Sequence, residues 1–160
     1  MKGYILNLNT KKRIEFKDST NQIVMLNDVR EVKIANYFTE QTLGRSEDYM
    51  VFSHSSSTEI TFHLGFWFNE PEKTKEIKDK FKSLLYPIKK GNIPIPPPPI
   101  LLVWGNLYNV RGVVKSFQAV PNDRYNLSKQ LPYGIDIFLE IVEVNIQPKY
   151  HGDLWKVEKK

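Results

Sequence analysis

The chain contains 160 residues, carries a formal net charge of +5 and has no cysteine. Its length favours a single domain, because domains commonly span about 100–200 residues. The lack of cysteine excludes disulfides, thiol nucleophiles and cysteine-ligated zinc, and no apolar run reaches the roughly 18 residues of a transmembrane helix. The composition therefore predicts one globular domain that is made in the cytoplasm and has no membrane partner.

The first third of the chain alternates apolar and polar residues as strands do. The extended segments expected there are residues 4–8, 13–16, 23–26 and 28–37. The first two of these form a hairpin through a turn at residues 9–12. Residues 38–57 are mostly polar, so we predict a long loop that contains one short strand at 49–52.

The clearest strand lies near the middle of the chain, where its apolar positions are Ile60, Phe62, Leu64, Phe66 and Phe68. Strict alternation of this kind places one whole face of a strand in a core. A helix is predicted next, over residues 71–88, with an apolar stripe formed by Ile77, Phe81, Leu84, Leu85 and Ile88. Pro71 suits the first turn of this helix, and we expect the side chain of Asn69 to cap it.

Residues 96–99 are four consecutive prolines, which force an extended backbone without hydrogen-bond donors. A strand at 100–104, a turn at Gly105-Asn106 and a return strand that contains Gly112 follow, so this part predicts a hairpin with a rigid entry. A PxxP segment is also the kind of ligand that SH3 or WW domains bind. Because no arginine flanks these prolines, we expect a stiff connector instead.

The last firm strand follows an aperiodic loop at residues 121–133. Its inward face is formed by Ile135, Ile137, Leu139 and Ile141. Phe138, Val142 and Val144 make the outer face partly apolar as well, which favours a partner surface there.

These elements amount to about seven strands and one amphipathic helix, which predicts an α+β domain that is mostly β. We expect the domain to span residues 1–148, and residues 1–20 to form an N-terminal hairpin extension of it. Residues 149–160 are expected to form a C-terminal tail.

No arrangement of residues in the sequence indicates catalysis or metal binding. The three histidines, His54, His63 and His151, lie far apart and lack the spacing of metal ligands. Motifs such as GxSxG and GxGxxG are absent, and acidic pairs such as Glu140 with Glu143 lie on opposite faces of one strand. We therefore predict no catalytic, cofactor-binding or metal-binding residues, and a protein that is not an enzyme.

The positive net charge raises the question of nucleic-acid binding. The basic clusters are Lys11–Arg13, Lys89–Lys90 and Lys159–Lys160, which lie in expected turns or at the chain end. A nucleic-acid surface instead places basic residues and exposed aromatic residues along one stripe. We interpret the positive charge as solvated surface charge.

One ordered set of segments resembles the tube-type domain of contractile injection systems. The segments are the loop Leu43–Ser46, the strand Thr58–Leu64, the helix from Pro71, the ILLVWG stretch at 100–105, the RGVVKS stretch at 111–116 and the closing strand at 137–144. The resemblance covers residues 22–146. The family includes tube-initiator and baseplate-hub proteins of contractile phage tails, often followed by a peptidoglycan-binding LysM domain.

Two features depart from the pattern of this family. Residues 121–133 contain no glycine and are longer than the acidic, glycine-bearing turn that is usual there. Residues 152–157 resemble the opening of a LysM domain, but only eight residues follow Gly152, fewer than such a domain needs. We expect a vestigial LysM-like motif, or a short extension that Trp155 anchors to a neighbour.

The resemblance implies a tail-tube-like β-barrel or sandwich with a structural function at the junction of baseplate and tail tube. The chain would form a homo-oligomeric ring in the virion, assembled in the host cytoplasm, with nucleic acid present only as cargo in the lumen. Its partners would be the tail tube protein and the hub or spike proteins of the baseplate. Neighbours would meet loop 38–57 and the outer face of the last strand, and the candidate contact residues are Trp67, Trp104, Tyr108, Arg111 and Trp155.

The competing hypothesis is a binding module for nucleic acid, or for peptidoglycan through the LysM-like tail at Gly152–Trp155. DNA binding that weakens steeply with salt would favour the first of these functions. Retention on peptidoglycan that is lost in a Trp155→Ala variant would favour the second.

Overall fold

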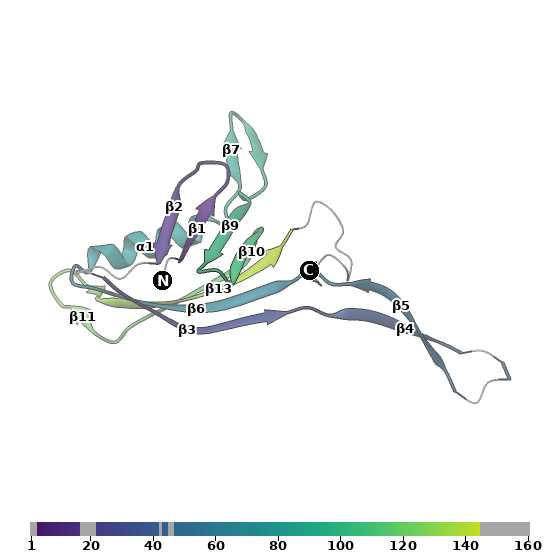
Figure 1. The fold of residues 1–160 in the computed structure, drawn as a ribbon. Coiled ribbons are helices and arrows are strands. Elements are labelled where there is room, and N and C mark those ends of the chain that lie inside the picture. Colours follow the sequence, from purple (N-terminus) through teal and green to yellow (C-terminus); the bar gives the residue numbers. More distant parts are fainter. Residues whose placement is uncertain (1–2, 17–21, 42, 45–46, 145–160) are drawn as a thin grey trace, which may run out of the picture.

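The computed structural model describes residues 3–16, 22–41, 43–44 and 47–144. Its main feature is a seven-stranded sheet in the order β2-β1-β9-β10-β13-β6-β3, in which every neighbouring pair is antiparallel (Figure 1). The strands are β1 (Gly3–Asn7), β2 (Arg13–Phe16), β3 (Gln22–Val32), β6 (Glu59–Phe68), β9 (Ile100–Trp104), β10 (Tyr108–Pro121) and β13 (Gly134–Glu143).

Three two-stranded hairpins and one helix complete the described part of the chain. The hairpins are β4 (Ala35–Glu40) with β5 (Tyr49–Ser55), β7 (Ile88–Lys90) with β8 (Ile93–Ile95), and β11 (Tyr125–Asn126) with β12 (Leu131–Pro132). The helix is α1 (Glu72–Ser83). This inventory confirms the predicted class, an α+β fold that is mostly β.

The N-terminal hairpin is part of the main sheet. Strand β1 pairs along its whole length with β9, so that Ile5 lies opposite Leu102. The turn before β2 is held by the side chain of Asn7, whose Oδ1 accepts hydrogen bonds from the amides of Asn9 at 2.9 Å and Thr10 at 3.2 Å. Residues 3–16 therefore extend the sheet by two strands.

The core lies between the sheet and α1. The strictly alternating residues of β6 and β13 are buried as predicted, and cross-strand register places Leu64 opposite Ile137 and Phe62 opposite Leu139. Helix α1 covers this face with Ile77 and Phe81. Burying each such side chain stabilises the fold by about 1.5–3 kcal/mol, so this alternation is the main determinant of the fold.

The helix is shorter than predicted and begins differently. It ends at Ser83, and the amides of the next residues bond carbonyls three positions back before Pro87, which cannot continue a helix. The N-cap position is Pro71 with no side chain capping it, so the expected cap by Asn69 is wrong. The first turn is fastened instead by buried Thr74, whose hydroxyl donates to the carbonyl of Pro132 at 2.8 Å.

The sheet curls strongly, but the strands that the structure describes do not close into a barrel. Its outer strands β2 and β3 each have one neighbour among the described strands of the sheet, which corrects the barrel expected from the resemblance. Register shifts in β10 between Val114 and Ser116 and in β3 between Leu26 and Asp28 increase the local twist. As a result, strands β9, β1 and β2 cross steeply over β13, β6 and β3 (Figure 1).

One side-chain contact gives the extent of the curl. The phenol of Tyr108 on β10 lies close enough to the carboxylate of Glu31 on β3 for that carboxylate to raise its pKa, although β13 and β6 lie between these strands in the sheet order. Three steps across a flat sheet span about 14 Å. The sheet must therefore curve around the core for these two side chains to meet.

Candidate assembly surfaces

The most conspicuous surface is an arm formed by β4 and β5, residues 35–55, which projects from the body of the molecule (Figure 1). The sequence predicted a loop with one short strand here, and that prediction is wrong because two strands pair from Ala35–Ser55 to Glu40–Tyr49. The arm continues β3 and β6 outward, since β4 begins three residues after β3 ends. It is therefore an extension of the sheet rather than an irregular loop.

The joint between arm and body is fixed by hydrogen bonds around Ser56. Its hydroxyl accepts from the amide of Ile34 at 2.9 Å, and its own amide donates to the Ile34 carbonyl at 2.7 Å. The ammonium group of Lys33 donates to the Ser56 carbonyl at 2.8 Å. These bonds set the direction in which the arm leaves the sheet.

The arm exposes large apolar side chains on both of its faces. They are Tyr37, Phe38, Leu43, Tyr49, Met50 and Phe52, and Met50 is 68% exposed. Two of these rings pack together, Tyr37 edge-on to Phe52, with centroids 5.5 Å apart. Among the described elements, β4 and β5 make their substantial contacts with each other. Contiguous exposed apolar surface of this kind marks an interaction site.

A second projecting hairpin is formed by β7 and β8, which leave the body in another direction (Figure 1). Its tip turns at Gly91, with φ of +64°, a backbone conformation that favours glycine. Tyr86, Ile93 and Ile95 are exposed there beside the exposed Lys89 and Lys90. This hairpin is a second candidate for contact with another molecule.

The proline tract connects this hairpin to β9. Pro98 is buried, and the carbonyl of Pro99 accepts a hydrogen bond from the amide of Leu8 at 3.0 Å. Packing and bonding of this kind favour the predicted connector over a ligand for SH3 or WW domains, because such a ligand presents its prolines to a groove.

The predicted contact residues do not gather in one place. Trp104 and Tyr108 face each other across the Gly105 turn and pack, half-buried, against the core. Arg111 is exposed on β10, whereas Trp67 lies at the far end of β6, opposite Gly134. Trp155 lies outside the described residues. The exposed aromatic residues of the arm were not among the candidates.

Tyr108 gives the fold a pH dependence that can be measured. Burial and the neighbouring carboxylate of Glu31 raise the pKa of Tyr108 above its ordinary value of 10.0. A raised pKa in the folded state means that folding is more favourable while the phenol is neutral than when it is ionised. That stability is present below about pH 10 and is lost as the pH rises through the raised value.

A Tyr108→Phe variant is expected to lower the free energy of unfolding at pH 8 by roughly 1 kcal/mol, the size of an ordinary polar interaction, because it removes the hydroxyl that lies beside the Glu31 carboxylate. The difference from the wild type should shrink as the pH rises above about 10, since the wild type then loses the same contribution. Urea unfolding of both chains between pH 8 and pH 11.5 measures this. A difference that stays constant with pH would contradict the linkage.

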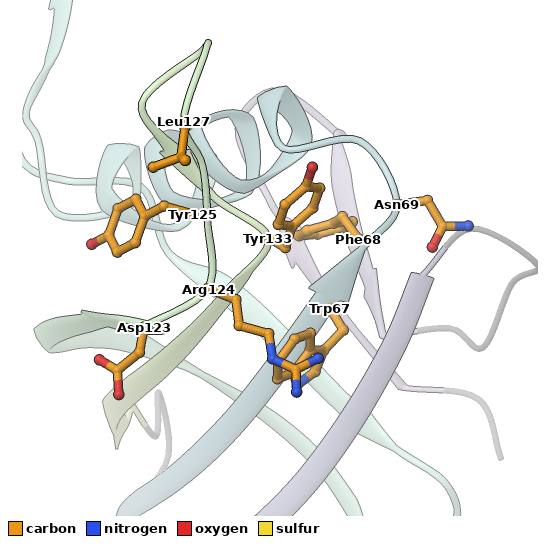
Figure 2. A pocket seen from close by; sticks show the side chains of 8 residues that line it. All are labelled: Trp67, Phe68, Asn69, Asp123, Arg124, Tyr125, Leu127 and Tyr133. Carbon is orange, nitrogen blue, oxygen red and sulfur yellow. The ribbon is translucent and has the colours of Figure 1, made fainter.

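A shallow depression lies at the end of β6 that is farther from the arm, and Figure 2 shows the side chains that line it. It measures about 920 Å³ and is lined by Trp67, Phe68, Asn69, Asp123, Arg124, Tyr125, Leu127 and Tyr133. The sequence separates the β6 end from the 123–133 segment by more than fifty residues. Pairing of β13 with β6 brings them together, with Gly134 opposite Trp67.

The 123–133 segment is ordered around Asn126, although the sequence showed no periodicity there. The side-chain oxygen of Asn126 accepts from the amides of Ser128 and Lys129, both at 3.1 Å, and its amide nitrogen donates to the Tyr133 hydroxyl at 3.0 Å. Lys129 also pairs with Glu72 at the start of α1, and this contact lowers the pKa of Glu72. The rim of the depression is thus built by local turn bonds and one ion pair.

The outer face of β13 is only partly available to a partner. The ring of Phe138 is stacked on that of His63 with centroids 4.2 Å apart, and His63 Nε2 lies 3.3 Å from Asp136 Oδ1. Beside them, Lys115 bridges Glu59 at 3.3 Å and Glu140 at 3.5 Å, and these carboxylates raise the pKa of Lys115. Solvent-exposed ion pairs of this kind contribute little stability.

The structure also bears on metal and membrane sites. No group of three or more His, Cys, Asp or Glu residues in the described ranges is placed to hold a metal ion. Among the same residues, no helix has the length and apolar character needed to cross a membrane.

Comparison with protein-family models and with curated protein sequences finds no match to this chain.

Proposed function

We propose that this chain is a structural, ring-forming subunit of the tail-tube type, located at the junction of baseplate and tail tube in a contractile phage tail or related injection system. The observation that carries the proposal is the arm. Large aromatic and aliphatic side chains stand exposed on both faces of the arm, Met50 at 68% among them. A protein that keeps such a surface in water needs a partner to bury it.

The geometry favours assembly with further copies of the same chain. The arm and the body surfaces are different patches, so a contact between them is heterologous, and heterologous contacts close into rings when the rotation per subunit permits. The outer edges of β2 and β3, which pair with no other strand that the structure describes, are also suited to neighbours, because an unpaired edge strand is a template for further strand pairing. The curled sheet would give such a ring a concave wall, with the hub or spike on one side and tube subunits on the other.

The direct test is the mass of the purified chain in solution, combined with electron microscopy of the same sample. We expect a concentration-dependent oligomer and ring-shaped particles, formed alone or after mixing with hub and tube proteins. A strict monomer at all concentrations, which never joins rings or tails in such mixtures, would contradict the proposal.

A second candidate function, saccharide binding, has one observation in its favour. The depression combines Trp67, Tyr125 and Tyr133 with the polar groups of Asn69 and Arg124 (Figure 2). Apolar rings with a few hydrogen-bonding groups are the usual lining of a small-ligand site. The adjacent charges of Asp123 and Arg124 oppose each other, so a neutral ligand such as a peptidoglycan sugar fits better than a nucleic acid.

Titration of the chain with soluble peptidoglycan fragments tests this second function. Tyr125→Ala is expected to weaken binding at least about tenfold if a stacked ring is lost, whereas the matched Tyr86→Ala change, outside the depression, leaves it unaltered. Binding that survives Tyr125→Ala and is lost in Trp155→Ala would assign it to the LysM-like tail. Absence of binding in the wild-type chain rejects the function.

A further inference from the structure

The charges of this chain are strongly segregated along the sequence. Residues 34–72 contain six acidic residues and a single basic one, whereas residues 80–122 contain six basic residues and no acidic one. The arm and the β7–β8 hairpin are the parts of these two regions that project from the body (Figure 1). The molecule therefore presents two protruding hairpins of opposite charge.

The acidic residues of the arm lie toward its outer end. Glu47 and Asp48 are exposed immediately before β5, and Glu40 at the end of β4 accepts a hydrogen bond from the hydroxyl of Tyr49 at 2.9 Å. Apolar side chains stand beside them, among which Met50 is two positions from Asp48 and 68% exposed. A partner for this surface must offer apolar area and positive charge together.

The β7–β8 hairpin offers that combination. Lys89 and Lys90 are exposed in β7, and Ile93, opposite Lys90 in the hairpin, is 72% exposed. Tyr86 adds an exposed ring at the base of the hairpin. None of the described ion pairs involves Lys89 or Lys90.

We propose that the acidic, aromatic arm of one copy docks on the basic, apolar β7–β8 hairpin of a neighbouring copy. This inference rests on the proposed ring-forming function and names the two halves of its subunit contact. One copy cannot make the contact within itself, because its arm and its hairpin project in different directions (Figure 1). Each copy thus gives an arm to one neighbour and a hairpin to another, which is the pattern of a heterologous ring.

Charge complementarity and apolar burial have separate roles in this contact. The opposed charges steer the encounter and fix which surfaces meet, and this contribution weakens as salt screens it. The apolar side chains on both hairpins supply affinity through the area that they remove from water. Arm-to-arm contacts are disfavoured, since they would bring Glu47 and Asp48 of two copies together.

Charge reversal with rescue tests the docking. Sedimentation velocity of the full chain is measured for the wild type, for Glu47→Lys/Asp48→Lys, for Lys89→Glu/Lys90→Glu, and for the chain with all four changes. Each reversed pair is expected to lower the association constant at least about tenfold, and the combination to restore most of it. A control pair, Lys75→Glu/Lys78→Glu on α1, changes the charge equally at another site and should leave association unaltered.

Cross-linking gives a second readout that does not depend on charge. Because the chain has no cysteine, Met50→Cys and Ile93→Cys variants each carry one thiol, and a disulfide forms only where Cα atoms approach within about 7 Å. Mixing the two is expected to give a mixed disulfide dimer, whereas Met50→Cys mixed with Lys75→Cys gives none.

The outcomes separate this inference from the proposed function. If the wild type and both charge-reversed variants all form rings, and the mixed disulfide does not form, the docking is overturned and ring formation remains in place. A wild-type chain that is monomeric under all conditions overturns both. Loss of association in each charge-reversed variant, together with recovery of association in the variant with all four changes, supports the docking.

Discussion

Replacement of residues 34–57 by Asn-Gly is expected to give a chain that folds but no longer assembles. Val32 and Glu59 are paired at the base of the arm, so Lys33 and Thr58 are placed to flank a two-residue turn, for which Asn-Gly is the favoured sequence. The core does not involve the arm. The midpoint of urea unfolding should therefore stay close to that of the wild type, while sedimentation shows a monomer at every concentration.

A milder variant tests the contribution of the arm's side chains while it keeps the backbone of the arm. Tyr37→Ser/Phe38→Ser/Phe52→Ser keeps the two strands but replaces three of the six large apolar side chains that the arm exposes. It is expected to weaken association by two orders of magnitude or more, since hot-spot aromatics contribute roughly 2 kcal/mol or more each. Rings that form normally from either variant would show that the arm is not the assembly surface.

Gly112→Ala is expected to destabilise the fold by about 3 kcal/mol or more, an exceptional effect for one methyl group. A Cβ at this position would lie 2.3 Å from the backbone oxygen of Val142 and 3.1 Å from Cγ2 of Ile141. Backbone cannot rotate away as a side chain can, so β10 would have to separate from β13 at the middle of the sheet. Thermal or urea unfolding measures the change.

Gly91→Ala is the matched control for this prediction. The same methyl group meets nothing within 4 Å at Gly91, where the cost arises only from the positive φ of +64°. A residue other than glycine in the left-handed backbone conformation lowers the free energy of unfolding by about 1–2 kcal/mol. Equal destabilisation by the two substitutions would show that the effect of Gly112→Ala does not arise from the close packing of β10 on β13.

The sequence predicts those parts of the fold in which one face is buried. Residues 60–68 and 135–141 alternate strictly because every second side chain enters the core, and the structure has strands β6 and β13 there. The return strand after the Gly105 turn is found for the same reason. In each case the burial of one face of the strand requires an apolar residue at every second position.

The arm could not be predicted from periodicity because most of its described side chains are exposed on both faces. Apolar and polar side chains occur on both sides of β4 and β5, so no alternation survives. The depression was missed for another reason, since its two halves come from distant segments that only the β13–β6 pairing brings together. The helix ends earlier than predicted because Pro87 cannot continue it. Its first turn is held by the hydrogen bond of Thr74 to Pro132 and not by a cap from Asn69.

The continuity of the arm with the sheet has a mechanical consequence. Tension applied to the arm along its length pulls β3 and β6 in the same direction, and the hydrogen bonds that join β6 to β13 run perpendicular to that pull. Such bonds are loaded together in shear and must yield together, unlike the bonds of a hairpin that is peeled open from its end. The arm is therefore a tether anchored by the pairing of β6 with β13 in the main sheet.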